Sequence, residues 1–196
     1  MSTVYIEKPS PEEVTFDLAA SLQKIGFVAS AGLVNRSLEE RRQFFNPGNL
    51  AHIASTQTFY REYAEDEGLY IATARRIGRE EAVGFALVKK AALETSDNTI
   101  QTQLHIEEFT ILPCDTVPIH EVGEQLVLAI QDCAEHEITA SILAENLFVL
   151  HALKSQGFTY NIRAFPEIME NYFGEGSRPA VQQQLILPVS KSLAVA

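Results

Sequence analysis

Residues 138–158 read I-T-A-S-I-L-A-E-N-L-F-V-L-H-A-L-K-S-Q-G-F, and this stretch decides the fold. Its first six residues form a short apolar run, which predicts a buried strand. A helix is indicated after Asn146, because Leu150 and Leu153 fall on one helical face. Gly157 should end this helix, since glycine readily adopts the left-handed backbone found at a helix C-terminus. The stretch therefore predicts a strand and a helix in close succession.

The residues before this stretch predict another helix and an antiparallel meander. Apolar residues at helical spacing indicate the helix over residues 122–135. Two β-rich runs, residues 69–75 and 82–89, are joined by a Gly-Arg-Glu turn and predict a hairpin. A third strand is expected over residues 99–112, where Pro113 ends it.

The two ends of the chain complete the order of elements. Ser10 and Pro11 mark a helix start, because serine caps helices and proline suits the first helical position. This helix should stop near Gly26, and a second helical region should begin at Ser37. The residues expected to face inward from the first helix are Val14, Leu18, Leu22 and Ile25. The remaining elements are strands over residues 4–7, 160–164 and 181–187, a helical segment over residues 51–64, and a tail from residue 189.

This order predicts an α/β chain of the α+β type, with a mixed, mostly antiparallel sheet flanked by helices. A strand–helix–strand–helix segment after an antiparallel meander is what makes the sheet mixed. The chain has 196 residues, which suits a single domain. Hydrophobic residues make up 46% of the chain, enough for a core, and this argues against global disorder.

Charge and cysteine content limit the classes of partner. The formal net charge of −11 argues against nucleic acid as a partner and would steer a cationic substrate such as an amine, although solubility alone explains the same charge. No apolar run is long enough to span a membrane, and the N-terminus lacks the pattern of a secretory signal. We therefore expect a soluble, cytoplasmic protein with no membrane partner. Cys114 and Cys133 form no metal-binding motif, so no metal site is expected.

Three short motifs add to the order of elements. Asn146 opens the segment N-L-F-V-L-H-A-L-K-S-Q-G-F, Ile111-Leu-Pro ends the third strand of the meander, and Gly123 begins G-E-Q-L-V in the next helix. They resemble, in turn, the N-x-x-A-x-x-x-Y-x-x-x-G-F motif, the V-x-P motif and the cofactor-helix motif of one superfamily. That superfamily is GNAT, the acyl-coenzyme-A-dependent N-acyltransferases.

The resemblance covers about residues 69–188 and implies a GNAT-like acyl-CoA N-acyltransferase fold. It implies one domain over residues 1–196, in which residues 1–68 are the variable strand and helices. In this fold the fourth and fifth strands splay apart, and the acyl-pantetheine arm of the co-substrate acetyl-CoA lies in the gap. The pyrophosphate lies at the N-terminus of the next helix, where free N–H groups bind anions. The implied contacts are Phe109, Thr110 and Ile111 for the arm, His120, Val122, Gly123, Glu124 and Gln125 for the pyrophosphate, and Asn146, which contacts the arm or caps its helix.

The chain departs from the family pattern in two places. The family loop is Q/R-x-x-G-x-G/A, whereas this chain has Pro118 at the first position, Glu121 at the first glycine and Gly123 at the last. A glutamate there would repel phosphates. A second register would place His120 at the basic position and Gly123 at the first glycine. The other departure is Leu153, which stands where many members have a tyrosine thought to protonate the departing thiolate.

Amine acylation needs a neutral amine, a polarised thioester carbonyl and a proton for the thiolate. Strand alternation predicts that His105, Glu107, Phe109 and Ile111 share one face. The resemblance implies that Glu107 or His105 takes the amine proton, although both also suit a cross-strand surface pair. For the acid, the run E-N-Y-F-G around Tyr172 resembles the Asn-Tyr-Tyr turn of ribosomal-protein alanine N-acetyltransferases. That turn also suits a simple cap on the sheet edge.

These features predict an acetyl-CoA-dependent N-acetyltransferase that acts by direct attack on a primary amine of a small molecule or a protein. The alternative is a catalytically impaired GNAT-like protein with a binding or regulatory role, motivated by Pro118, Glu121 and Leu153. A third hypothesis is a partner-binding protein whose first 68 residues carry the interaction surface. The sequence names no acceptor and leaves a homodimer open as the assembly state.

Overall fold

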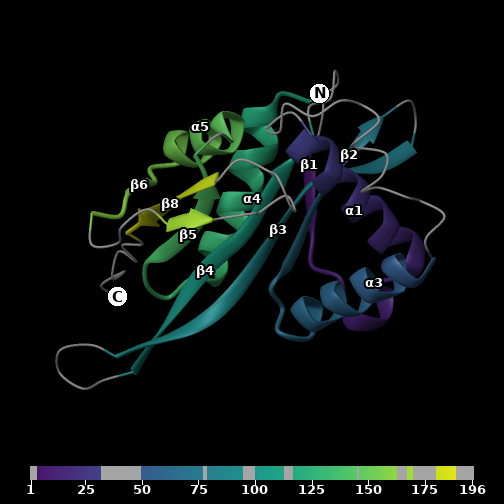
Figure 1. Cartoon of the computed structure of the whole chain (residues 1–196), viewed down its shortest axis with the longest axis horizontal. Coiled ribbons are helices and arrows are strands. Elements are labelled where there is room, and N and C mark those ends of the chain that lie inside the picture. The colour runs from purple at the N-terminus through teal and green to yellow at the C-terminus, as the bar shows by residue number, and fades with distance from the viewer. Residues whose placement is uncertain are drawn as a thin grey trace, which may run out of the picture.

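The computed structural model describes residues 4–31, 50–76, 79–94, 100–112, 117–144, 146–162, 167–169 and 180–188. Within these residues the chain forms one eight-stranded sheet with helices on both faces (Figure 1). The helical elements are η1 (Pro11–Glu13), α1 (Phe16–Ala31), α3 (Leu50–Glu65), α4 (Ile119–Cys133) and α5 (Leu147–Ser155). The strands are β1 (Val4–Glu7), β2 (Leu69–Arg76), β3 (Arg79–Glu94), β4 (Ile100–Ile111), β5 (Ile138–Leu143), β6 (Thr159–Tyr160), β7 (Glu167–Met169) and β8 (Ala180–Leu187).

The order of strands across the sheet is β1-β2-β3-β4-β5-β8-β6, with β7 also paired to β8. Every neighbouring pair is antiparallel except β4 and β5, which run parallel because α4 carries the chain back between them. The predicted mixed, mostly antiparallel sheet is therefore confirmed. The expectation of two final strands is wrong, since β7 adds a third.

Each face of the sheet has its own hydrophobic core. On one face, α1 and α3 pack on the sheet, with Leu22 and Tyr60 in the same cluster as Phe85. On the other face α4 and α5 pack together over the sheet, with Ile130 and Leu153 in the second cluster. We call these the α1/α3 face and the α4/α5 face; Figure 1 shows the two helix pairs on opposite sides of the sheet.

The start and end of α1 differ from the sequence-based expectation. Ser10 does form a capping box with Glu13, but it caps only the short turn η1. The helix proper begins at Phe16, where the Thr15 hydroxyl accepts the Leu18 N–H at 3.2 Å. The expected stop at Gly26 is wrong, because α1 continues to Ala31. A Cβ at Gly26 would lie 3.5 Å from Glu108 Oε1, so this glycine lies at a close contact between helix and sheet. The helix start expected at Ser37 lies outside the described residues.

Candidate functional site

An opening forms where β4 and β5 separate. The two strands pair only from Leu104 with Ile138 to Ile106 with Ala140. Beyond this point β4 continues to Ile111 beside β3, and β5 continues to Leu143 beside β8. The pairing thus ends between the two strands that the GNAT resemblance predicts to splay apart; a pantetheine arm between them stays a prediction.

Backbone groups of β4 face this opening. The Leu112 N–H donates to the Val83 carbonyl at 2.7 Å, so Leu112 points its backbone toward β3. Antiparallel pairing alternates along a strand, which turns the backbone N–H and C=O of Phe109 and Ile111 away from β3 and toward the opening. These are two of the three residues predicted to pair with the pantetheine arm. Thr110 lies between them and, by the same alternation, bonds to β3.

A β-bulge marks the point at which the strands part. Leu87 lies opposite Glu108, whereas the next residue, Val88, lies opposite Ile106, so Glu107 is an extra residue in β4. The bulge shifts the alternation of side chains by one position. Two consecutive carboxylates, Glu107 and Glu108, consequently point to the α1/α3 face.

The bulge overturns one expectation from the sequence. Leu104, Ile106, Phe109 and Ile111 all belong to the core on the α4/α5 face. His105 lies between two of them and faces the other side, together with Glu107. The prediction that His105, Glu107, Phe109 and Ile111 share one face is therefore wrong. Alternation of side chains along a regular strand does not predict where a bulge inserts an extra residue.

Glu107 is held by two donors. Lys89 Nζ lies 2.9 Å from one carboxylate oxygen, and the Tyr63 hydroxyl of α3 donates to the other. Burial acts to raise the pKa of Glu107, but the bonds from Tyr63 and Lys89 outweigh it and hold that pKa below its usual value. Burial, with Glu107 beside it, raises the pKa of Tyr63 to about 12. Glu107 is thus a fixed carboxylate with little tendency to accept a proton.

Glu108 has the opposite environment. Its carboxylate accepts a bond from the Thr110 hydroxyl at 3.2 Å and lies beside Gly26 of α1. Burial raises the pKa of Glu108 above its usual value. Glu108 was not singled out from the sequence, because strand alternation places it on the other face from Glu107.

His105 is bonded through both ring nitrogens to hydroxyl groups of β5. Its Nδ1 lies 2.8 Å from Thr139 Oγ1, and its Nε2 lies 3.1 Å from Ser141 Oγ. The Ser141 hydroxyl in turn donates to Gln184 Oε1 of β8 at 2.8 Å. Burial lowers the pKa of His105, so the imidazole is neutral at neutral pH. No local sequence pattern marks Thr139 and Ser141, which reach His105 through strand pairing, or Gln184, which bonds to Ser141.

The N-terminus of α4 lies after Pro118, its N-cap residue. The Pro118 carbonyl accepts the N–H groups of Glu121 and Val122 at 3.0 and 3.4 Å. The N–H groups of Ile119 and His120 precede the first intrahelical bond and can therefore meet an anion. His120 is exposed, whereas Val122 and Gly123 are buried and Glu124 and Gln125 are half-buried in the following turn.

Gly123 lies at the contact between α4 and α5. A Cβ at this position would lie 2.9 Å from the Ala152 Cβ and 3.3 Å from Ile111 Cδ1. The glycine therefore lets the two helices approach closely. Its predicted contact with the pyrophosphate stays a prediction.

The signature segment forms α5 as expected. The Asn146 side chain accepts the Val149 N–H at 3.3 Å, which is the capping role, while its contact with the pantetheine arm stays a prediction. Gly157 has φ +93° and follows the helix, where its N–H donates to the Lys154 carbonyl at 3.0 Å. Leu153 is fully buried in the core. Tyr172, the predicted acid, lies outside the described residues.

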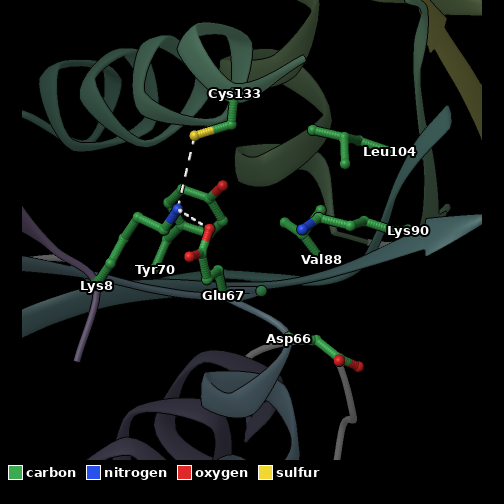
Figure 2. A pocket seen from close by; sticks show the side chains of 9 residues that line it. Lys8, Asp66, Glu67, Tyr70, Val88, Lys90, Leu104 and Cys133 are labelled. Atoms are coloured by element: carbon green, nitrogen blue, oxygen red, sulfur yellow. Dashed lines mark hydrogen bonds and ion pairs between the residues drawn. The ribbon is translucent and has the colours of Figure 1, made fainter. Parts of the chain in front are cut away.

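A cavity of about 270 Å³ lies at the C-terminal end of α4 (Figure 2). Lys8 and Cys133 line it, with Lys8 Nζ 3.6 Å from Cys133 Sγ and 3.7 Å from a Glu67 carboxylate oxygen. None of the residues predicted to be catalytic or to bind the cofactor lines this cavity. We therefore place the candidate site at the strand opening and not here.

The described part of the chain holds neither a cluster of metal-binding side chains nor a helix that could span a membrane. Within it, no group of three or more His, Cys, Asp or Glu side chains could hold a metal ion. None of the helices in the described ranges has the length and apolar character needed to cross a membrane.

Comparison with known proteins identifies the fold. No model of a protein family matches the sequence, and no curated protein is significantly similar to it.

Solved structures do match over almost the whole chain. A GNAT-family acetyltransferase from Bacillus cereus ATCC 10987 is 12% identical, with a TM-score of 0.54, and 96% of this chain and 99% of that chain are covered. NAA60 of Arabidopsis thaliana in complex with a bisubstrate analogue is 10% identical, with a TM-score of 0.58 and coverage of 96% and 100%. The NatC complex bound to Gag peptide and CoA is 16% identical, with a TM-score of 0.53 and coverage of 95% and 99%. The chain therefore has the fold of the GNAT acetyltransferases, as its residue pattern predicts.

Proposed function

We propose that this chain is an N-acetyltransferase that transfers the acetyl group of acetyl-CoA to a primary amine by direct attack. The observation that carries the proposal is the opening between β4 and β5. Backbone groups of Phe109 and Ile111 face it, and its strands part at the bulge residue Glu107. Among the solved structures of this fold, NatC is bound to CoA, which supports acetyl-CoA as the co-substrate.

The parts of the site have distinct tasks in this proposal. The β4 backbone at Phe109 and Ile111 would pair with the amides of the pantetheine arm, as an added strand does. The N–H groups of Ile119 and His120 would meet the pyrophosphate. Each of these contacts uses backbone groups, so they tolerate the departures from the family loop at Pro118 and Glu121.

The acceptor is proposed to be a cationic or N-terminal amine. Glu107 and Glu108 place two carboxyl groups on the α1/α3 face beside the opening, and the chain carries a net charge of −11. A carboxylate beside the entrance attracts an ammonium group and orients it before it loses its proton.

Calorimetry with acetyl-CoA and the full chain tests the proposal. We expect saturable binding with a dissociation constant below about 1 mM, which corresponds to about −4 kcal/mol. Desulfo-CoA should compete, since it keeps the arm and the pyrophosphate. An absence of heat at about 1 mM acetyl-CoA, in protein shown to be folded by circular dichroism, would refute the proposal.

A second function, a GNAT-like binding or regulatory protein without turnover, is favoured by one specific observation. Leu153, where many family members carry the acidic tyrosine, is fully buried in the core. This second function predicts acetyl-CoA binding without release of a thiol when amines are added. Thiol release that depends on an amine, followed with a chromogenic disulfide, would exclude it.

A further inference from the structure

Ser141 lies at the point where β4 and β5 separate. The last paired residues are Ile106 and Ala140, so Glu107 and Ser141 are the first residues of the two diverging arms. Both side chains point to the α1/α3 face, since Ser141 bonds to His105 there. A thioester carbonyl lying in the opening would meet Ser141 from the side of β5.

The chain of hydrogen bonds through His105 can run in either direction. Ser141 Oγ lies 3.1 Å from His105 Nε2 and 2.8 Å from Gln184 Oε1, so its single proton can turn to either acceptor. Thr139 Oγ1 lies 2.8 Å from Nδ1 and 3.5 Å from the Leu104 carbonyl, which offers the same choice at the other nitrogen. No heavy atom moves when the direction reverses. Such a chain can take up a proton at one moment and return it at the next.

The charges around His105 suit a proton held for a short time. Glu107 on the same strand is a fixed carboxylate that stabilises an imidazolium, whereas Lys89 of β3, which is paired with Glu107, acts against one. The groups that β5 presents to the ring are uncharged hydroxyls. The resting imidazole is neutral, because burial lowers the pKa of His105.

We propose that Ser141 and His105 carry the proton of the attacking amine to the departing sulfur, and this inference rests on the proposed acetyl transfer. Ser141 touches the reacting atoms and is the catalytic residue. His105 acts through Ser141 and is a positioning residue that stores the proton. The pair supplies the acid function that Leu153 cannot.

The step balances without any other reactant. The amine nitrogen attacks the thioester carbonyl carbon, and the new N–C bond leaves an extra proton on nitrogen. Ser141 Oγ takes this proton while its own proton passes to His105 Nε2. When the C–S bond breaks, the sulfur takes the electron pair, Ser141 gives it a proton, and Nε2 returns its proton to Oγ. The products are the amide and the free thiol, and both side chains are restored.

Kinetics of thiol release test the proposal on the full chain. The probes are acetyl-CoA and a fixed panel of primary amines: spermidine, histamine, 2-phenylethylamine and a peptide with a free N-terminal alanine. Ser141→Ala and His105→Gln should lower kcat by at least about tenfold, with KM for acetyl-CoA within about twofold, because only proton transfer is lost. Ser141→Thr keeps the hydroxyl and should stay within about threefold of the wild type. Ser155→Ala on α5 is the matched control and should leave kcat unchanged.

Two further readouts separate proton transfer from a structural role. The wild-type rate should fall as the pH falls through the pKa of His105, while Glu107 and Lys89 keep their charges; His105→Gln should lose this dependence. Imidazole ¹⁵N spectra should show a shifted His105 Nε2 signal in Ser141→Ala, because its bonding partner is gone. Circular dichroism and acetyl-CoA binding confirm that each variant is folded.

The outcomes distinguish failure of the proton shuttle from failure of the proposed acetyl transfer. An active wild type with unchanged kcat in folded Ser141→Ala overturns the proton shuttle and leaves the acetyl transfer standing. A wild type that binds acetyl-CoA yet releases no thiol with any amine of the panel overturns the proposed transfer, and the shuttle with it. A kcat loss in Ser141→Ala that Ser141→Thr restores supports the shuttle.

Discussion

At the scale of single residues, Glu107 and Glu108 show how one bulge separates two chemically identical neighbours. Both carboxyl groups reach the α1/α3 face, but Glu107 has a lysine and a tyrosine as donors, whereas Glu108 has a threonine hydroxyl. The two donors of Glu107 hold its pKa below the usual value, whereas burial raises the pKa of Glu108 although the bond from Thr110 acts to lower it. The two residues should therefore affect stability in opposite directions as the pH changes.

Glu108→Gln should raise the melting temperature at pH 7. The pKa of Glu108 is higher in the folded chain than in the unfolded chain, so its stabilisation is complete below the unfolded pKa and is lost as the pH rises. Replacing a buried charge by a neutral amide then stabilises the folded state at neutral pH. The gain should shrink toward pH 4, where the carboxyl is protonated in both states.

Glu107→Gln is the matched variant and should lower the melting temperature at pH 7. Its folded pKa is depressed, so its contribution is present above the unfolded pKa and is lost as the pH falls through the folded pKa. Thermal unfolding of both variants at pH 4 and pH 7 measures the effect. Shifts of the same sign at pH 7 would contradict the assignment of the two environments.

Glu121→Gln should tighten acetyl-CoA binding. Glu121 is half-buried in the first turn of α4, close to the N–H groups proposed for the pyrophosphate. Removing one like charge about 4 Å from a phosphate is worth about 1 kcal/mol in water, or about fivefold in affinity. Asp132→Asn, an exposed change at the other end of α4, should leave the affinity unchanged when both are measured by calorimetry. Equal affinities for Glu121→Gln and the wild type would place the pyrophosphate elsewhere.

At the scale of elements, the contact between α4 and α5 depends on Gly123 and Ala152. Gly123→Ala adds a Cβ 2.9 Å from the Ala152 Cβ and should destabilise the chain by about 1–3 kcal/mol. In an Ala152→Gly background the contact with the Ala152 Cβ is gone and only the end of the Ile111 side chain, at 3.3 Å, must shift, so the same change should stabilise by up to about 1 kcal/mol through helix propensity. Urea unfolding of the four proteins gives the coupling free energy. A coupling near zero would show that the helices are not in close contact.

The same pair of variants separates packing from phosphate binding. The double variant, Gly123→Ala with Ala152→Gly, should be more stable than Gly123→Ala alone. If Gly123 also lies against the pyrophosphate, the affinity for acetyl-CoA should stay reduced in the double variant. Recovery of both stability and affinity would assign Gly123 to packing.

At the scale of the whole molecule, the described residues before Leu69, which are 4–31 and 50–68, form part of the folded body. They supply β1, which pairs with β2, and α1 and α3, which bury Ile71, Phe85 and Leu87 of the sheet to 0–1% exposure. Each such side chain is worth about 1.5–3 kcal/mol of burial. A chain of residues 69–196 should therefore fail to fold, as measured by circular dichroism and hydrogen exchange. A folded fragment would revive the hypothesis that residues 1–68 are a separate interaction module.

The sequence by itself determined most of the order of elements, because apolar periodicity and end signals are local, but it did not mark the short strand β7. Strand β5 and the helix α5 with its Asn146 cap and Gly157 end are predicted to within a residue. His105 and Glu107 were identified beside the opening for the same reason, since a motif in the same strand implies their positions.

Only the tertiary structure decided which groups surround them. The bulge at Glu107 is an extra residue in the pairing of β4 with β3, so it is defined by the register of two strands and no local pattern marks it. Because β4, β5 and β8 lie side by side, Ser141 meets His105, which is 36 residues away in the chain, and bonds to Gln184, which is 43 residues away. The sequence therefore determined the fold class, whereas strand pairing between distant segments decided which polar groups lie where β4 and β5 part.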